Sequence, residues 1–391
     1  MTKFREVFKN RNFISLWLGQ IISQFGDRLN HMALIALLYA RAPGSALQLA
    51  KVFSCTIIPV FLVGPIACSC VDRWDHRRTM VIGDLLRAAL IALIAIFFVH
   101  GATLVPIYII IFLVFSVSRF FVPAKMSIIP ELVSKDKLLL ANSLSSTTGM
   151  IAAVVGFGLG GLIVERVGSQ GGFFLDSLTY VISASFIFSI ATRRVFRLEG
   201  TKNESKSEDT PKPIIKTSIL SDIKDGWLYV VRNKSASFVG RTFFLVWSAV
   251  GAVYVVTIVF VQKTLGSVTR DLGVLAMCLG AGLLCGALTY GRLGEKLSKI
   301  RMIFLALAVS GAVLSIWTVF LQLFASILFT AGLSFILGLT LSPIMISSHT
   351  LIHQFTDEKM RGRVFGTLEI IAHLGFLIFM FISSFLAERI G

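Results

Sequence analysis

Asp72-Arg73-Trp74-Asp75-His76-Arg77-Arg78 and Gly291-x-x-x-Glu295-Lys296 followed by Arg301 each come after a long apolar segment of this chain. Asp72 and Glu295 are separated by 295 − 72 = 223 positions. Glu165-Arg166-Val167-Gly168 recurs as Glu388-Arg389-Ile390-Gly391 at the same separation, since 388 − 165 is also 223. Two unrelated strings at one offset indicate a duplicated membrane unit, and such duplications are typical of transporters.

The composition excludes a soluble globular domain. Mean hydropathy is +0.82, 55% of the residues are hydrophobic and 15% are charged, whereas a soluble domain has about 25% charged residues. Apolar runs of about 20 residues recur along the chain, each long enough to cross a bilayer as a helix. We find no phosphate-binding loop, no zinc-protease motif and no cysteine spacing typical of zinc, so we expect neither an enzyme nor a metal or other cofactor.

The net charge of +16 reflects membrane topology. Basic residues gather in alternate loops, while the intervening loops hold little beyond Arg41, Arg166, Lys263 and Arg270. This bias predicts a cytoplasmic N-terminus in a plasma or inner membrane and gives no indication of nucleic-acid binding. The basic N-terminus is not followed by a short apolar stretch with a cleavage site, so we expect no removable signal peptide.

Apolar periodicity predicts an all-α polytopic protein of about 11 spans. We expect a six-helix N-terminal bundle over 1–191, a cytoplasmic linker with an amphipathic helix over 192–236, and a five-helix C-terminal bundle over 237–391. The predicted spans are 13–40, 45–71, 79–99, 104–124, 139–166, 171–191, 237–262, 271–291, 302–321, 325–347 and 364–387.

The sequence pattern predicts that the second repeat is shorter than the first by one helix. Glu165-Arg166-Val167-Gly168 precedes the sixth span, whereas the equivalent string finishes at Gly391. Two interpretations stay open: a chain shortened relative to a twelve-span parent, which we favour, or a transporter that works with an incomplete second half.

The paired six-helix units, the basic turn after the second span and the long central loop resemble the major facilitator superfamily over the whole chain. The closest branch includes macrolide and enterobactin exporters and lysophospholipid transporters. The motifs that carry the resemblance are Trp17-Leu18-Gly19-Gln20, Gly64-Pro65, Asp72-Arg73 to Arg78, Gly83-Asp84-Leu85-Leu86-Arg87, Pro123-Ala124-Lys125, Pro130-Glu131-Leu132-Val133 and Ala141-Asn142-Ser143-Leu144.

Two positions depart from the pattern of the resembling family. Cys68 stands where the loop motif usually has glycine, and Phe157 stands where the glycine-rich exporter motif, here Gly156 to Gly161, has its customary proline. Small residues let helices approach closely, so close packing is the simpler interpretation of this glycine run.

The first span carries the strongest candidate for chemistry. Gln20, Gln24, Asp27 and His31 follow at i, i+4, i+7 and i+11, which places them on one narrow stripe of a helix. An ionisable group inside the bilayer costs about 2.5–3.5 kcal/mol on insertion scales, so such a residue is a functional candidate. The resemblance implies that this helix lines a central cavity. We therefore expect the stripe to bind substrate or a proton, the alternative being that Asp27 pairs permanently with Arg28, Lys51 or another helix.

Other charged residues are weaker candidates for a substrate or proton site. Arg241 lies in the seventh span, where it could enter the cavity or extend to the membrane interface. Arg119 in the fourth span resembles the arginine found in that helix of proton antiporters. Lys125 lies at the membrane edge, where it could contact a lipid phosphate or serve as an ordinary interfacial anchor. Asp84 and Arg87 are expected to pair at i, i+3. The resemblance makes Asp176 a structural acid more readily than a coupling site.

The resemblance also implies a conformational latch at the cytoplasmic side. Asp72 would bind the positive N-terminal end of a neighbouring helix while basic residues pair across the two halves, which would hold the outward-open state. The expected members are Asp72, Arg73, Arg77, Arg78, Glu295, Lys296, Arg301 and Glu369.

These patterns predict a secondary active transporter, with proton-coupled efflux of hydrophobic or amphipathic small molecules favoured over lysophospholipid transport. A non-transporting membrane sensor is a remote third possibility. We expect membrane lipids and the cargo as partners, a monomeric protein, and a proton gradient as the energy source.

Overall fold

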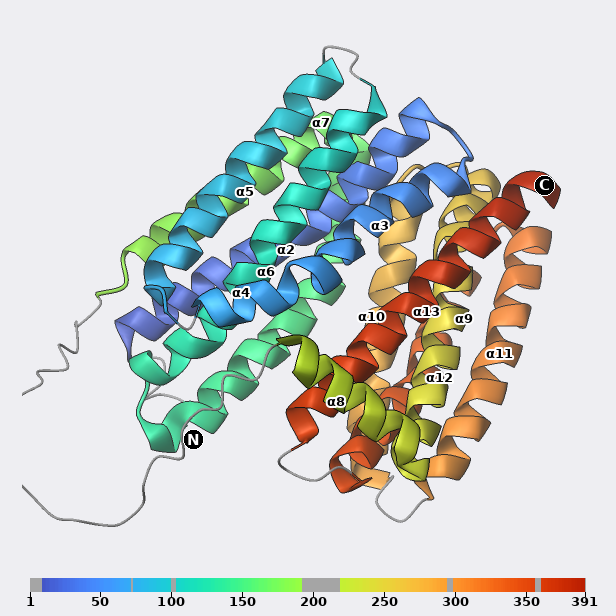
Figure 1. Ribbon diagram of the computed structural model, residues 1–391. Helices are drawn as coiled ribbons and strands as arrows, with labels where there is room; N and C mark the ends of the chain where they lie inside the picture. The colour runs from blue at the N-terminus through green and yellow to red at the C-terminus, as the bar shows by residue number, and fades with distance from the viewer. Residues whose placement is uncertain are drawn as a thin grey trace, which may run out of the picture.

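The computed structural model describes residues 9–71, 73–99, 103–191, 219–293, 298–355 and 360–390, and these residues are almost entirely helical (Figure 1). The first half contains α2 (Arg11–Arg41), α3 (Ala46–Leu62), α4 (Gly64–Val71), α5 (His76–Val99), α6 (Leu104–Leu132), the short η1 (Lys135–Lys137) and α7 (Leu138–Phe188). The second half contains α8 (Ile219–Arg232), α9 (Lys234–Leu265), α10 (Arg270–Leu293), α11 (Lys299–Phe324), α12 (Ile327–Phe355) and α13 (Arg361–Ile390).

Helices occupy every predicted span. Polar caps fix the starts of two of them: the Asn10 side chain accepts hydrogen bonds from the backbone of Asn12 and Phe13 at 3.1 and 3.2 Å, and Ser45 accepts one from Gln48 at 3.3 Å. Eight of the described helices are long and apolar enough to cross a membrane, or nine if the bent pair α3 and α4 is one span. The predicted all-α polytopic fold is therefore confirmed, while the count of eleven spans stays a prediction.

Helix α7 contains both the fifth and the sixth predicted spans. It runs for 51 residues, but Gly168 has φ +76° and ψ 174°, a conformation outside the helical region. Glycine adopts positive φ without the steric penalty of a Cβ atom, so the chain turns there. We refer to residues 138–167 and 169–188 as the first and second arms of α7.

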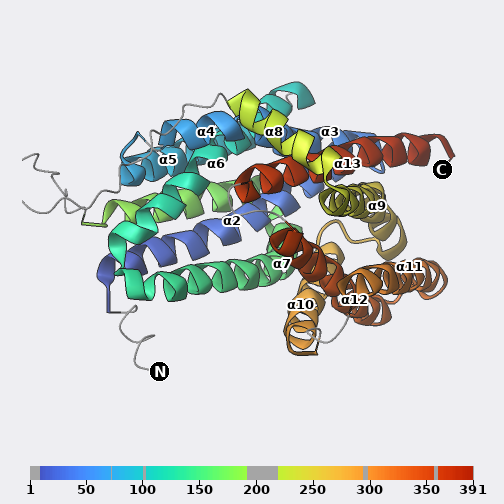
Figure 2. The ribbon, with the colours of Figure 1, turned by 60° about the horizontal axis from the view of Figure 1, so that its bottom comes forward.

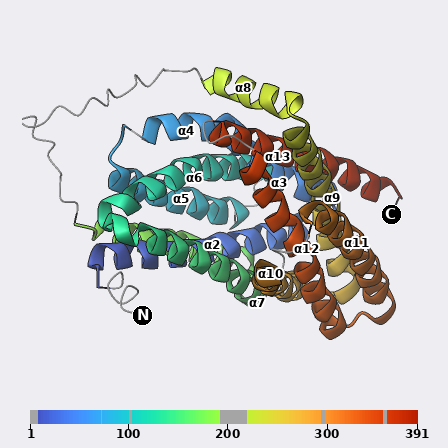
Figure 3. The same ribbon diagram turned by 90° about the horizontal axis from the view of Figure 1, so that it is seen from below.

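The two halves form two bundles that lie side by side (Figure 2). Helix α8 lies across α13 and leads into α9 (Figure 3). Asp225 of α8 pairs with Arg363 of α13 at 3.0 Å, and a Cβ atom at Gly226 would lie 2.6 Å from the Arg363 carbonyl, so the two helices cross closely.

The bundles share their apolar core at one end of the molecule. The largest buried cluster draws on both bundles, with Leu34 and Phe53 from the first and Val255 and Met380 from the second. Two smaller clusters each belong to a single bundle, one around Phe13 and the other around Ile303 and Val364. Figure 1 shows the bundles converging where α2 and α13 finish and spreading apart where these helices begin. We call these the closed end and the open end.

Candidate functional site

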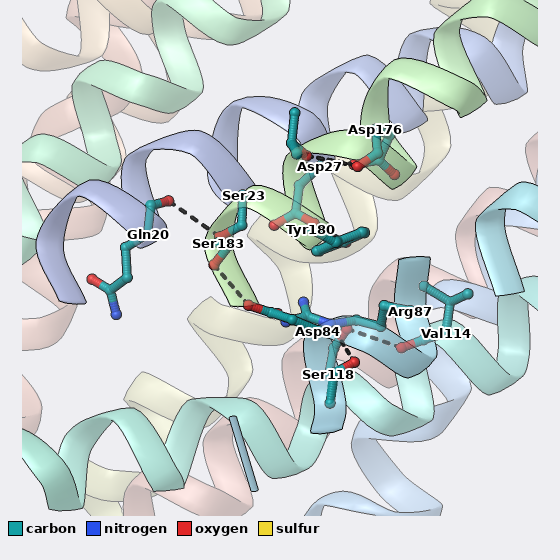
Figure 4. Close-up of polar contacts among 12 residues, drawn as sticks. Gln20, Ser23, Asp27, Asp84, Arg87, Val114, Ser118, Asp176, Tyr180 and Ser183 are labelled. Carbon is teal, nitrogen blue, oxygen red and sulfur yellow. Dashed lines mark hydrogen bonds and ion pairs between the residues drawn. The ribbon is translucent and has the colours of Figure 1, made fainter. Parts of the chain in front are cut away.

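A buried polar network lies inside the first bundle, between α2, α5 and the second arm of α7 (Figure 4). Tyr180, which is 1% exposed, donates a hydrogen bond to the Asp27 carboxylate. The Arg87 guanidinium lies over the Tyr180 ring, 4.4 Å from its centroid. Tyr180 thus joins Asp27 of α2 to a cation of α5.

Asp84 and Arg87 form an ion pair in α5, as their spacing predicts. Both side chains are buried, and the second Asp84 oxygen accepts a hydrogen bond from Ser183 at 2.7 Å. The other face of Arg87 contacts the Phe121 ring, 4.6 Å from its centroid. The Asp84 carboxylate accepts hydrogen bonds from Arg87 and Ser183, and aromatic rings lie beside the Arg87 cation, so both charges of this buried pair have partners.

Asp176 adds a third carboxylate to the same region. It is fully buried, it accepts a hydrogen bond from Asn30, and its Oδ2 atom has no hydrogen-bond partner. A Cβ atom at Gly26 would lie only 2.5 Å from Asp176 Oδ1, so glycine is what allows α2 to come this close to the acid. An unpartnered oxygen on a buried acid is costly if the acid is ionised.

The network places three carboxylates close together. Asp27, Asp84 and Asp176 all act on the Arg87 guanidinium, and Arg119 and Lys125 act on Asp27 from α6. Several carboxylates that share a low-dielectric region do not all ionise, because like charges repel and burial removes hydration. Asp27 is the one of the three acids that is partly exposed, so it is the one within reach of water.

The predicted stripe on α2 packs against α7. Gln20 is buried and accepts a hydrogen bond from Ser145 at 3.0 Å, while Gln24 packs over Gly149, where a Cβ atom would lie 2.8 Å from its Oε1 atom. Asp27 bonds Tyr180 instead, and His31 has a different set of neighbours. The structure does not bring Asp27 and His31 into contact with a shared partner.

His31 begins a chain of aromatic side chains that crosses from the first bundle to the second. Its ring stacks on Phe53 at 5.8 Å between centroids, and Phe53 meets Tyr254 of α9 at 5.2 Å. Tyr254 meets Phe376 of α13 at 5.6 Å, and Phe376 meets Trp247 at 6.4 Å. This aromatic chain supplies an apolar, polarisable surface where the bundles meet.

The other predicted site cations occupy different places. Arg119 of α6 is partly buried, its Nε atom has no hydrogen-bond partner, and it lies within electrostatic reach of Glu369 of α13 and of Asp27. Lys125 is also partly buried and within electrostatic reach of Asp27. Arg241 is exposed and donates to the Ser237 carbonyl at 3.3 Å, so its described contact lies within its own helix.

Most of the predicted latch residues lie apart from one another. Asp72, Glu295 and Lys296 lie outside the described residues. The Arg77 side chain donates to the carbonyls of Ile187, at 3.3 Å, and Phe188, both in its own bundle.

The remaining latch residues lie at exposed positions. Arg78 reaches Asp75 at 4.0 Å, and Arg73, Arg301 and Glu369 are exposed. The contacts described for Arg77 and Arg78 thus lie within the first bundle.

The closed end carries a pair of contacts that follow the sequence repeat. Glu165, at the end of the first arm of α7, accepts hydrogen bonds from the backbone N–H groups of Val268, Thr269 and Arg270 at 3.2, 2.6 and 3.1 Å. Glu388, its equivalent in the repeat, accepts from Ser45 Oγ at 2.5 Å. It also accepts from the Leu47 backbone N–H at 3.0 Å. Each carboxylate therefore caps the N-terminus of a helix in the opposite bundle, α10 or α3.

The glycine run beside Glu165 packs against both neighbours. A Cβ atom at Gly161 would lie 2.5 Å from the Thr269 carbonyl, and one at Gly158 would lie 2.5 Å from Met277 Sδ. At Gly156 the nearest atom would be Arg28 Cγ at 2.9 Å. Close packing of α7 on α10 and α2 accounts for these glycines.

Two helical bundles that close at one end are consistent with a major facilitator superfamily transporter, and comparison with known proteins shows that the chain is such a transporter and not an enzyme. Residues 5–351 match the family described as transmembrane secretion effector, so the chain belongs to that family.

Three relatives are similar to the chain over most of its length. The MFS-type transporter YkuC of Bacillus subtilis is 26% identical over 92% of this chain and 82% of its own. The multidrug efflux pump Tap of Mycolicibacterium fortuitum is 25% identical over 89% and 82%, and macrolide efflux protein A of Streptococcus pyogenes is 23% identical over 97% and 90%.

Solved structures agree on the fold. The nucleoside transporter NupG superimposes with a TM-score of 0.74 at 9% identity, over 96% of this chain and 90% of its own. The D-xylose–proton symporter does so with a TM-score of 0.68 at 13% identity, over 96% and 89%.

Sequence reasoning missed Tyr180, Ser183 and the aromatic partners of His31. Tyr180 lies 153 positions from Asp27, within an apolar span where a tyrosine is unremarkable as sequence. One signal could have indicated a polar face on that span. Tyr180 and Ser183 follow Asp176 by four and seven positions, which places their hydroxyl groups on the same side of a helix as the acid.

Proposed function

We propose that this protein is a secondary active exporter of hydrophobic or amphipathic small molecules, driven by the proton gradient. It works by alternating access in the plasma or inner membrane as a monomer, with its N-terminus in the cytoplasm. The relatives named as a multidrug efflux pump and a macrolide efflux protein support export, and the basic loops support the orientation.

The observation that carries proton coupling is the hydrogen bond from Tyr180 to Asp27. Asp27 is partly exposed, whereas Asp84 and Asp176 are fully buried, so Asp27 is the acid that exchanges protons with water. A proton on Asp27 removes its charge from a cluster that includes Arg87 and on which Arg119 and Lys125 also act. An ionised Asp27 only accepts hydrogen bonds, whereas a protonated Asp27 can also donate one to the Tyr180 phenol. Protonation therefore changes the hydrogen bond that joins α2 to α7.

Alternating access supplies the transport cycle. In the described state the bundles share a core at the closed end, which corresponds to the outer side if the N-terminus is cytoplasmic. The opposite state would break this core and bring the predicted latch residues together at the open end. Protonation and deprotonation of Asp27 would bias the equilibrium between the two states.

The test is transport by purified protein in proteoliposomes under an imposed pH gradient. We would offer a hydrophobic cation, a macrolide and a lysophospholipid in turn and follow the uptake of each. Asp27→Asn is expected to abolish pH-driven uptake at normal expression. Asp225→Asn is the matched control, because Asp225 pairs with Arg363 far from the acidic cluster and its loss should leave uptake unchanged. Normal pH-driven uptake by Asp27→Asn would remove Asp27 from the coupling role.

A lysophospholipid transporter is the second candidate. Arg119 and Lys125 favour it, because two partly buried cations on one membrane helix suit a phosphate headgroup. Movement of lysophospholipid between leaflets without proton flux would support this function over export. A folded protein that moves none of the three cargoes under any gradient would support the sensor alternative.

A further inference from the structure

Arg28 of α2 is a partly buried cation with no acidic partner among the described residues. It follows Asp27 on α2, but the Asp27 carboxylate is bonded by Tyr180 on another face of the helix. The Arg28 Nε atom is buried and makes no hydrogen bond, and the guanidinium lies over the Phe157 ring, 4.9 Å from its centroid. A guanidinium offers five donors in a fixed fork that suits carboxylate, sulfonate and phosphate groups. Among the residues that the structure describes, none accepts a hydrogen bond from the buried Arg28 Nε.

Packing holds Arg28 at the junction of the bundles. Its aliphatic stem lies against Gly156 of α7, where a Cβ atom would be 2.9 Å from Arg28 Cγ. Its charge acts on His31 of α2 and on Tyr254 of α9, so the guanidinium is near both bundles. The residue is therefore positioned between the two halves that move relative to each other during transport.

His31 offers a second unused polar group at the same place. Its Nδ1 atom is buried and has no hydrogen-bond partner. The ring is enclosed by Phe53, Phe115 and Phe157, at 5.8, 6.2 and 6.1 Å between centroids. An apolar enclosure that contains two unsatisfied nitrogen groups is typical of a binding site in which polar groups fix the ligand's orientation.

Other charged groups lie around this place. Arg119 and Lys125 add two cations from α6, and Asp27 and Glu369 are the acids that act on them. Neither acid forms an ion pair with Arg28 in the described part of the chain. Ionisable residues inside a membrane protein are paired or functional, so the unpaired Arg28 is suited to an anion from outside the protein.

We propose that the transport site binds an anionic amphipathic substrate. Arg28 holds its acidic group, with His31 as a second polar contact, and the aromatic chain from Phe53 through Tyr254 and Phe376 to Trp247 binds its apolar or aromatic body. This inference deepens the proposed function and rests on it, since it names the cargo class of an exporter as organic anions with a large apolar part.

A matched set of probes tests the charge requirement by binding alone. Pyrenebutyrate, pyrenebutanol and pyrenebutylamine share one aromatic body and are anionic, neutral and cationic at neutral pH. We would titrate each into the full chain in lipid nanodiscs and subtract the pyrene fluorescence change of empty nanodiscs. We expect pyrenebutyrate to bind about tenfold more tightly than pyrenebutanol, with pyrenebutylamine the weakest, because charge-assisted hydrogen bonds are about twice as strong as neutral ones. Equal affinities for the three probes would overturn the proposal.

Substitutions then assign the effect to Arg28. Arg28→Gln should weaken pyrenebutyrate by about tenfold and pyrenebutanol by less than about twofold, and Arg28→Lys should fall between wild type and Arg28→Gln. Arg166→Gln, at an exposed arginine on α7, is the control and should change neither affinity. Unchanged pyrenebutyrate binding by Arg28→Gln would contradict the assignment to Arg28. If Arg28→Gln does not fold, Arg28→Lys takes its place. Unchanged pyrenebutyrate binding by Arg28→Lys, together with equal affinities of the wild type for the three probes, would then contradict the assignment.

Competition distinguishes the two sources of such an anion. Displacement of pyrenebutyrate by lysophosphatidylglycerol at similar concentration would assign the site to a lipid headgroup, and displacement only by aromatic carboxylates would assign it to small organic anions. Failure of the proposed function has a different signature: proton-driven uptake would be missing for every cargo. Failure of this inference would leave uptake intact but indifferent to the charge of the cargo.

Discussion

Tyr180 is the residue through which the acid on α2 and the cation on α5 affect each other. Its hydroxyl bonds Asp27, and its ring carries the Arg87 guanidinium at 4.4 Å. A change of charge on Asp27 therefore alters the electrostatic environment of a buried ion pair that Asp27 does not touch directly.

Tyr180→Phe should separate the effect of the hydrogen bond to Asp27 from the effect of the ring contact with Arg87. The ring and the contact with Arg87 remain, while the hydrogen bond to Asp27 is lost, at a cost of about 1–3 kcal/mol in stability. We expect pH-driven uptake to fall about tenfold, with uptake down a cargo gradient retained, as measured in proteoliposomes. Equal losses of both kinds of uptake would indicate that the hydrogen bond only supports the fold.

The Asp84–Arg87 pair gives a prediction about stability. Arg87→Met leaves Asp84 buried and unpaired, and loss of one partner of a buried pair costs about 3–5 kcal/mol. The double variant Asp84→Asn/Arg87→Met removes both charges and should be markedly more stable than Arg87→Met. Thermal unfolding in detergent measures the difference, and additive losses in the double variant would show that the two charges do not act as a pair.

At the scale of elements, the sequence repeat becomes a structural symmetry. Glu165 caps α10 and Glu388 caps α3, and each capping contact joins the two bundles at the closed end. Because these hydrogen bonds must break when that end opens, the two glutamates stabilise the described state over the opposite one.

Removing the caps should open the closed end. Loss of one N-cap costs about 0.5–2 kcal/mol, so Glu165→Ala or Glu388→Ala should each raise the population open at this end severalfold, and the double variant more. Spin labels on Val105→Cys of α6 and Leu323→Cys of α11 lie at exposed positions in different bundles. In a background without the native cysteines, double electron–electron resonance between these labels measures the distance between the two bundles.

A third acid provides the control for the capping experiment. Glu131 pairs with His76 at 2.8 Å within the first bundle, so Glu131→Ala should leave the distance distribution unchanged. A distribution that is identical in wild type and in the double variant would show that the caps do not hold the closed end.

The helices could be predicted from the sequence to a greater extent than the site. Apolar length predicts the long helices, because a membrane helix must satisfy its own backbone and expose apolar side chains. It does not predict the break between α3 and α4 or the short η1. The turn at Gly168 and the pairing of Asp84 with Arg87 are local, so they too follow from nearby residues. The partners of Asp27, Glu165 and Glu388 lie more than a hundred positions away, and only packing of the bundles determines them.

The whole molecule shows one of the two arrangements that alternating access requires. A core shared by both bundles closes one end, and separate cores serve the bundles at the other. The close contact at Gly161 and the two capping glutamates add to the shared core at the closed end, so the opposite arrangement must replace all of these contacts.

Proton coupling through Asp27 is the central claim, and one comparison tests it most directly. Wild-type protein and Asp27→Asn would be reconstituted in parallel, and each would be assayed for exchange of cargo across the membrane without a pH gradient and for accumulation of the same cargo with one. We predict that Asp27→Asn retains exchange but loses accumulation, because alternation continues while the proton no longer drives it. Accumulation equal to that of the wild type would contradict the account.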